Sequence, residues 1–425
     1  MNTKKKIFFP IMTLGLIISI IMALATRGQI LWEQIFQHDK TDVFMDFFHS
    51  VTDSVQKNPY SYGVLYPPIT YLFYRFFAFF IPERHVIMGG YVLQHNCSAM
   101  MVYFFYSVIA VLGFGYIIRN FYKDKKTCSW LIVLLVLSGP ALFLFERGNC
   151  VIVAFFFLGI YLLWKDSDSK VQRELALMAL AISFCFKIYP ALFGVMLIKE
   201  KRYKDAIRCI IYALLFFLVP FFAFGGIGAV GQWIGGVSHN MDKESGVNAG
   251  IGYKINFSST YIALAAIFLR IKNNDAFMGL MGTFGTVTSI IAFAAGIFSK
   301  NKWKTIALFS CVMLGFPGFS YQYMMIFMAI PLCLFLEEDK KFDLWDLLYT
   351  ILYIFQFILF TVNIITVAYL AGGVCLMRFL NFVECCGLLG MTWLLVIEVI
   401  YNVVKEQRSL KIAPKKPLKK ALAKN

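Results

Sequence analysis

Apolar runs of about 20 residues recur along most of this chain, and short polar or charged stretches separate them. Runs of this length match the hydrocarbon core of a bilayer when they are helical. A membrane β-barrel would instead show strands of about ten residues with alternating polarity. We therefore expect an all-α polytopic membrane protein with about 12 transmembrane helices, some of them broken or re-entrant.

The first run, residues 7–26, follows three lysines and is longer than a signal-peptide core, so we expect it to be retained as a helix. Two external loops are expected at about 27–62 and 225–259. Residues 64–81 open with two prolines and contain an arginine, which favours an interfacial helix on the external side. We expect a single integral membrane domain over 1–404, followed by a basic cytoplasmic tail at 405–425.

The remaining runs give the other expected helices. A run at 175–198 is interrupted by Lys187-Ile188-Tyr189-Pro190, which predicts two short helices meeting at a break, as in helices that line a cavity. Residues 261–271 are too short to span easily and are expected to be interfacial. Spanning helices are expected at 91–118, 130–145, 151–164, 206–224, 277–298, 305–316, a run ending at 336, 344–365 and 374–404.

Composition and charge support this assignment. Hydrophobic residues make up 60% of the 425-residue chain, above the level of soluble proteins. The net charge of +16 would suggest nucleic-acid binding in a soluble protein, but here the basic residues gather between alternate apolar runs. The positive-inside rule then predicts that both termini lie in the cytoplasm. We expect a multi-pass protein of the cell (plasma) membrane with no nucleic-acid partner.

The candidate functional residues are charged residues within or beside apolar runs, where burying a charge costs free energy. Asp42 and Asp46 follow the first helix and would share one helical face, although acids here could also be solvated loop residues. Lys187 stands inside an apolar run, where it would face an aqueous cavity and bind phosphate, or form a structural ion pair. Arg147, in Glu146-Arg147-Gly148-Asn149, could bind phosphate or pair with Glu146. The cysteines show no metal-binding spacing, and we expect neither a metal nor a cofactor.

Five stretches in this order resemble glycosyltransferase family 87 of the GT-C superfamily. They are DFFHS from Asp46, YPPITYLFYRFFAFFIP from Tyr66, ERGN from Glu146, KIYP from Lys187 and the late PGFSYQY…AIP. The resemblance covers roughly residues 7–336 and implies a GT-C-type fold that uses lipid-phosphate sugar donors. It also implies that Asp46 is the general base of an inverting transfer, with Asp42 as an assistant or substitute.

Further residues are candidates for binding the substrates. Lys187, Arg147 and His239 are expected to bind the donor phosphate. The substrate-binding candidates are Tyr66, Asn149, Ser259 and Gln322, although for Tyr66 a structural role at the start of a helix is the stronger interpretation. Relatives can carry a histidine near the late turn, where this chain has Ser320-Tyr321-Gln322-Tyr323, which leaves a hydrogen bond from Gln322 as the alternative.

The resulting hypothesis is a hexosyltransferase of the membrane. It would move a hexose such as mannose from a polyprenyl-phosphate sugar to a lipid-linked or cell-envelope glycan acceptor on the external face. The alternatives are a lipid or glycan transporter, which should show repeat symmetry between its halves, and an envelope polymer ligase or polymerase.

Overall fold

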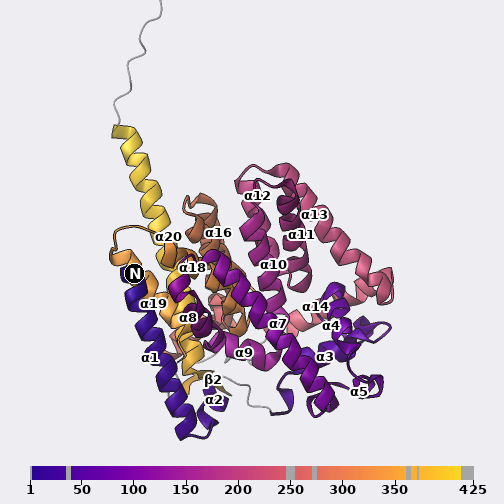
Figure 1. Ribbon diagram of the computed structural model, residues 1–425. Coiled ribbons are helices and arrows are strands. Elements are labelled where there is room, and N and C mark those ends of the chain that lie inside the picture. Colours follow the sequence, from indigo (N-terminus) through magenta and orange to yellow (C-terminus); the bar gives the residue numbers. More distant parts are fainter. Residues whose placement is uncertain are drawn as a thin grey trace, which may run out of the picture.

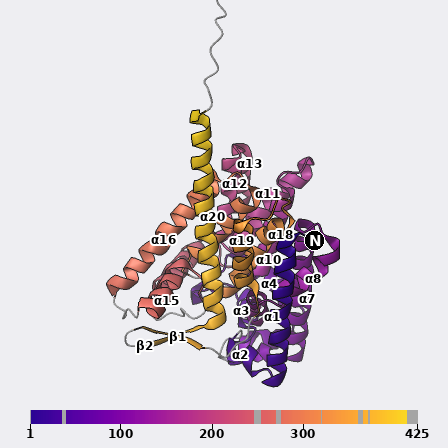
Figure 2. The same cartoon turned by 90° about the vertical axis from the view of Figure 1, so that its left-hand side faces the viewer.

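The computed structural model describes residues 2–34, 40–245, 254–269, 275–318, 320–359, 365–370 and 373–412. Residues 413–425 of the expected tail lie outside this part of the chain. Helices dominate, and one antiparallel hairpin pairs Ile365 with Arg378 through to Leu370 with Gly373. The all-α prediction is therefore confirmed for nearly the whole fold, with this hairpin as an addition (Figure 2).

In the first half, short elements gather around the first polar stretch, and most of the longer helices lie outside it (Figure 1). They are α1 (Thr3–Ala25), α2 (Gln29–Gln34), η1 (Lys40–Asp42), α3 (Met45–Ser54), η2 (Pro59–Tyr62), α4 (Pro68–Ala78), α5 (Glu83–Ile87), α6 (Gly90–Gln94), α7 (Cys97–Phe121), α8 (Lys125–Val136), α9 (Gly139–Arg147), α10 (Val151–Trp164), α11 (Lys170–Phe186), η3 (Tyr189–Gly194) and α12 (Val195–Lys199).

The second half contains the longest helix and the hairpin. Its elements are α13 (Tyr203–Leu218), η4 (Val219–Ala223), α14 (Ile227–Ser245), α15 (Phe257–Leu269), α16 (Asp275–Phe298), α17 (Lys302–Gly315), η6 (Gln322–Met328), α18 (Ala329–Glu337), α19 (Leu344–Phe357), β1 (Ile365–Leu370), β2 (Gly373–Arg378) and α20 (Phe379–Ile412).

Within the described residues, five helices are long and apolar enough to cross a membrane by length and composition. A sixth arises if α8 and α9, which meet at a 57° bend, count as one span. The expected count of about 12 is therefore not confirmed. The bend falls beside Ser138-Gly139-Pro140, where proline at the start of α9 is compatible with a new helix but not with a continuing one. Other expected spans, including Val151–Trp164 and Leu344–Phe357, form apolar helices of only 10–17 residues.

Three local expectations need correction. The connection 225–259, expected as a loop, contains the 19-residue helix α14, which forms although several of its residues are glycine, a poor helix former. The helix expected over 344–365 ends at Phe357, and the one expected from 374 begins at Phe379, with the hairpin strands Ile365–Leu370 and Gly373–Arg378 between them. The break after α11 does occur as predicted: Lys187 follows α11, and the short η3 begins two residues later.

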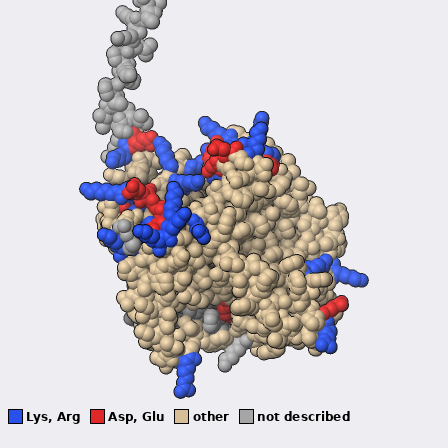
Figure 3. Space-filling model, in the orientation of Figure 1, with Lys and Arg blue, Asp and Glu red and all other residues tan. Residues whose placement is uncertain are grey.

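Charged segments that are far apart in the sequence meet at one end of the molecule, which we call the charged end (Figure 3). There the start of α1 contacts the turn before α8 and the connection between α18 and α19, and Lys4 and Asp346 are both almost fully buried. The linking contacts are Lys5–Asp124 (3.3 Å), Lys5–Glu337 (2.6 Å), Asn301–Glu338 (2.7 Å), Lys302–Asp166 (3.4 Å) and Lys300–Glu406 (2.6 Å). These are the connections that the charge pattern assigned to one side of the membrane.

The opposite end carries the short elements α2 to α5 (Figure 1). α3 packs against α4 and α6, and η2 lies against α14, where the Asn58 amide donates to Gln232 Oε1 at 2.8 Å. We call this the site end, because the predicted catalytic acids lie here.

Candidate functional site

The local backbone around α3 fixes the position of Asp46. Phe44 adopts a left-handed conformation with φ of 63°, and its amide donates to the carbonyl of Glu146 at 2.7 Å. The Phe44 ring also packs on Tyr103, with 4.4 Å between ring centroids. The chain then enters α3 at Met45, so Asp46 lies in the first helical turn, where the helix dipole favours a carboxylate.

Arg147 bridges the two acids that the sequence singled out. Its guanidinium donates to Asp42 Oδ2 at 2.5 Å and to Asp46 Oδ1 at 2.6 Å, and it also bonds the Asp42 carbonyl at 2.9 Å. Its side chain is 12% exposed, against 25% and 20% for those of Asp42 and Asp46. Such charge-assisted bonds hold the carboxylates in place. Arg147, which was expected to bind the donor phosphate, thus forms ion pairs with Asp42 and Asp46.

Asn149 holds the other oxygen of Asp46. Its side-chain Nδ2 donates to Asp46 Oδ2 at 2.6 Å and to the Tyr66 hydroxyl at 2.9 Å, while its side-chain Oδ1 accepts from the Val151 backbone amide at 3.1 Å. Asn149 is almost fully buried, so its orientation is tightly set. A carboxylate has about four acceptor sites, and these two bonds leave further lone pairs on Asp46. Asp46 is therefore oriented and still able to accept a proton.

One cavity of about 410 Å³ brings the predicted groups together, and we call it the Asp46 cavity. Asp46, Tyr66 and Lys187 line it from three different segments. The Lys187 ammonium lies 4.6 Å from the centroid of the Tyr66 ring, in range of a cation–π interaction. Burial raises the pKa of the Tyr66 hydroxyl well above its ordinary value, so Tyr66 stays protonated.

Three predicted residues lie elsewhere. His239 is on the exposed face of α14 and does not line the Asp46 cavity, whereas its neighbours Val237 and Asn240 do. Gln322 is buried and donates to Glu384 Oε1 at 2.9 Å. Ser259 is buried in the first turn of α15, where its amide donates to Asn256 Oδ1 at 2.8 Å. The direction of each side chain depends on how its helix packs against the rest of the protein, and the sequence pattern alone does not show this.

The cavity also contains residues that the sequence interpretation did not select. His49 and Asp53 lie three and seven positions after Asp46, which places all three on one face of α3. Helical spacing could therefore have identified them. Burial raises the pKa of Asp53 to about 6. Tyr321 and Tyr323 come from the segment around η6, and nothing local in the sequence predicts their approach to α3.

The chain matches the model of glycosyltransferase family 87 over residues 65–317, more than half of its length. No curated protein matches it. The match includes Tyr66, Arg147, Asn149 and Lys187, and it begins after Asp46. The helices that could cross a membrane agree with a membrane enzyme. The chain belongs to glycosyltransferase family 87.

Proposed function

We propose that the protein transfers a hexose, with mannose as the first to test, from a polyprenyl-phosphate sugar to a lipid-linked or cell-envelope glycan acceptor. The reaction takes place at the site end, on the external face of the plasma membrane. The observation that carries this proposal is that Asp46 and Lys187, an oriented carboxylate and an ammonium group, line the same cavity.

In this proposal Asp46 acts as the general base. It takes the proton of the acceptor hydroxyl while that oxygen forms a bond to the anomeric carbon of the sugar. The bond between the anomeric carbon and the phosphate oxygen breaks, and the electron pair leaves with the polyprenyl phosphate. The attack comes from the face opposite the phosphate, which inverts the anomeric configuration. Asp46 later releases the proton to water.

Lys187 stabilises the charge that develops on the leaving phosphate. An ammonium group in a partly buried cavity interacts with a phosphate more strongly than it does in bulk water. Arg147 is bonded to Asp42 and Asp46, and in this scheme it positions the base. The Tyr66 hydroxyl, which stays protonated, can donate a hydrogen bond to a sugar or phosphate oxygen.

An apolar groove beside the cavity supports a lipid-linked donor. The groove has a volume of about 600 Å³ and lies among α11, η3, α12 and α13. It meets the Asp46 cavity at Ile188, which lines both, and at Trp233, whose Nε1 donates to the carbonyl of Leu65 at 2.9 Å. Ile210 and Leu214 line the groove and are 59% and 53% exposed, so the groove opens toward the bilayer. Part of a prenyl chain would fit here with its phosphate at Lys187.

A transfer assay tests this proposal. The purified full-length chain in nanodiscs is supplied with polyprenyl-phosphate mannose or polyprenyl-phosphate glucose carrying a labelled sugar, together with envelope glycolipids as acceptors. We expect label in the glycolipid fraction, with loss of that activity in Asp46→Asn and retention in Asp168→Asn, an exposed acid at the charged end. Movement of the intact donor across the membrane without sugar transfer would favour a transporter instead.

A further inference from the structure

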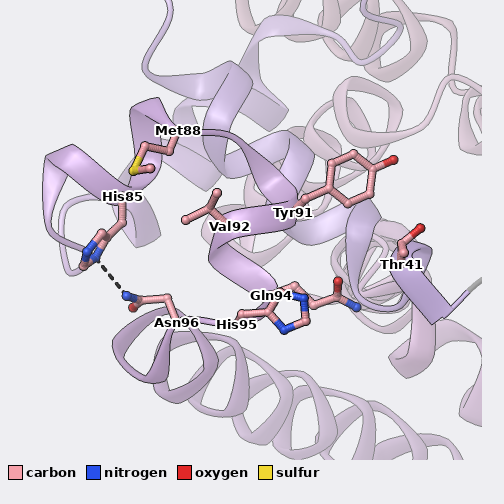
Figure 4. Close-up of a pocket in the computed structure, with 8 residues that line it drawn as sticks. All are labelled: Thr41, His85, Met88, Tyr91, Val92, Gln94, His95 and Asn96. Carbon is pink, nitrogen blue, oxygen red and sulfur yellow. Dashed lines mark hydrogen bonds between the residues drawn. The ribbon is translucent and has the colours of Figure 1, made fainter.

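A second, larger cavity lies at the site end and plays no part in the chemistry above. It has a volume of about 780 Å³ and is formed by α5, α6 and the residues around them (Figure 4). We call it the α5–α6 hollow. Its lining includes Thr41, Met88, Tyr91, Gln94 and His95.

The lining has the chemistry of a site for uncharged sugars. It combines an aromatic ring and a methionine with hydroxyl, amide and imidazole groups, and none of the described residues that line it is Asp, Glu, Lys or Arg. Hydroxyl-rich ligands need paired donors and acceptors, which amide and imidazole groups supply, and apolar sugar faces pack on aromatic rings. An anionic ligand would call for a permanent cation, and none of the described lining residues is Lys or Arg.

Several of these groups are presented on a fixed scaffold. Asn96 caps α7 by accepting from the Ala99 amide at 3.1 Å, and its side-chain nitrogen lies 2.9 Å from His85 Nδ1 (Figure 4). The Gln94 amide donates to the carbonyl of Val43 at 3.1 Å, which ties α6 to the segment before α3. Tyr91 and His95 are exposed at the surface of the hollow, where a ligand can reach them.

The hollow and the Asp46 cavity share a wall. His49 lines the Asp46 cavity, and its ring lies edge-on to Tyr91 of the hollow, with 5.4 Å between centroids. Gly90 packs so closely on His49 that an added Cβ would lie 3.0 Å from His49 Nδ1. On the other side, Thr41 of the hollow directly precedes Asp42, which is bonded to Arg147. A molecule bound in the hollow is therefore separated from the Asp46 cavity by the wall that His49 and the Thr41–Asp42 segment form.

We propose that the α5–α6 hollow binds the uncharged saccharide portion of the acceptor, beyond the sugar whose hydroxyl attacks the donor. This inference rests on the proposed function, since it presupposes a glycan acceptor. It assigns acceptor recognition to α5 and α6, separate from the donor groups at Lys187.

Direct binding of neutral oligosaccharides tests the inference without requiring catalysis. Fluorescently labelled mannotetraose and maltotetraose are titrated against the full-length chain in nanodiscs and followed by fluorescence anisotropy. We expect saturable binding of at least one probe that weakens about three- to ten-fold in Tyr91→Ala and in His95→Ala. Tyr62→Ala, which removes a tyrosine 77% exposed on η2, is the matched control and should bind as the unaltered chain does.

The outcomes separate this inference from the proposed function. Asp46→Asn should lose transfer and keep tetrasaccharide binding. Equal affinities for Tyr91→Ala, His95→Ala and the unaltered chain, or no saturable binding of either neutral probe, would overturn the assignment of the hollow. Stronger binding of a labelled tetragalacturonate, a uniformly anionic probe, would overturn the choice of an uncharged ligand.

Discussion

At the scale of single residues, the carboxylate of Asp46 is held at both oxygens by donors, from Arg147 and from Asn149. Asp46→Asn removes the basic carboxylate. It also replaces one carboxylate oxygen with an NH2 group, so that one of the two donors, Arg147 or Asn149, then faces another donor. General-base assistance is worth about 10²–10⁴ in rate, so we expect turnover to fall by that factor or more. Steady-state transfer with a fixed donor measures it, and a thermal-shift assay checks that the variant is folded.

Asp42→Asn is the paired control for this substitution. Arg147 also bonds the Asp42 carbonyl, so the backbone contact survives in this variant, and we expect less than about a ten-fold loss. Near-normal transfer by Asp46→Asn together with inactive Asp42→Asn would assign the base to Asp42. Activity in both variants would remove the α3 acids from the mechanism.

Lys187 is the cation of the Asp46 cavity in our proposal for the donor. Hydrogen bonds to charged groups contribute about 1.5–3 kcal/mol, so Lys187→Met should raise the donor KM by at least about ten-fold. Lys204→Met, at an exposed lysine of the charged end, is the matched control and should leave the donor KM unchanged. A folded Lys187→Met variant with an unaltered donor KM would assign Lys187 a purely structural role.

Asp53 makes stability depend on pH. Burial raises its pKa to about 6 from an ordinary value of 3.8, so between these values the folded state binds the proton more tightly than the unfolded state. The burial penalty is therefore negligible below about pH 3 and close to complete above about pH 7. Asp53→Asn should stabilise the protein above about pH 7, by at most about 3 kcal/mol, and have almost no such effect at about pH 3. Thermal unfolding at both pH values checks this, and an equal gain at both would contradict it.

At the scale of elements, the turn between α9 and α10 positions Arg147 and Asn149, the two residues that donate hydrogen bonds to Asp46. Gly148 has φ of 67°, and an added Cβ would lie 2.7 Å from the Cβ of Phe47 in α3. Gly148→Ala should destabilise the protein and reduce turnover, because it pushes Arg147 and Asn149 away from α3. Gly63→Ala, with φ of 76° and open space around it, should show only the backbone strain of about 1 kcal/mol. Thermal unfolding and transfer rates for the two variants separate strain from steric contact, and equal effects would exclude the contact with Phe47.

Structural features that follow from neighbouring residues could be predicted from the sequence, and those that depend on contacts between distant residues could not. The break at Lys187 follows from a proline and a charge inside an apolar run, and the structure has it there. The hairpin at Ile365–Arg378 was missed because its apolar residues continue the pattern of the neighbouring helices. For the site, Lys187 stands out by its polarity inside an apolar run, whereas polarity marks Asp42 and Asp46 alike and only the family resemblance points to Asp46. The Arg147–Asp46 pair joins residues 101 positions apart, and no local pattern indicates it.

At the scale of the whole molecule, basic residues mark one end and the proposed chemistry occupies the other. The ion pairs among Lys5, Asp124 and Glu337 place the start of α1, the turn before α8 and the end of α18 together, as the charge pattern had predicted. Lys57, beside α3, belongs to the site end. If the positive-inside rule sets the orientation, the charged end faces the cytoplasm and the Asp46 cavity faces outward.

This orientation can be measured with two exposed lysines, Lys57 and Lys125. Each is changed to cysteine in a chain whose exposed Cys97 is replaced by serine, which lowers the labelling background, because the other described cysteines are buried or partly buried. A membrane-impermeant maleimide should label Lys57→Cys in intact right-side-out vesicles, and Lys125→Cys only after permeabilisation. The reverse pattern would put the Asp46 cavity in the cytoplasm, where soluble nucleotide sugars are available, and would remove the main reason for a lipid-linked donor. Labelling of both positions in intact vesicles would show that the two ends do not lie on opposite sides of the membrane.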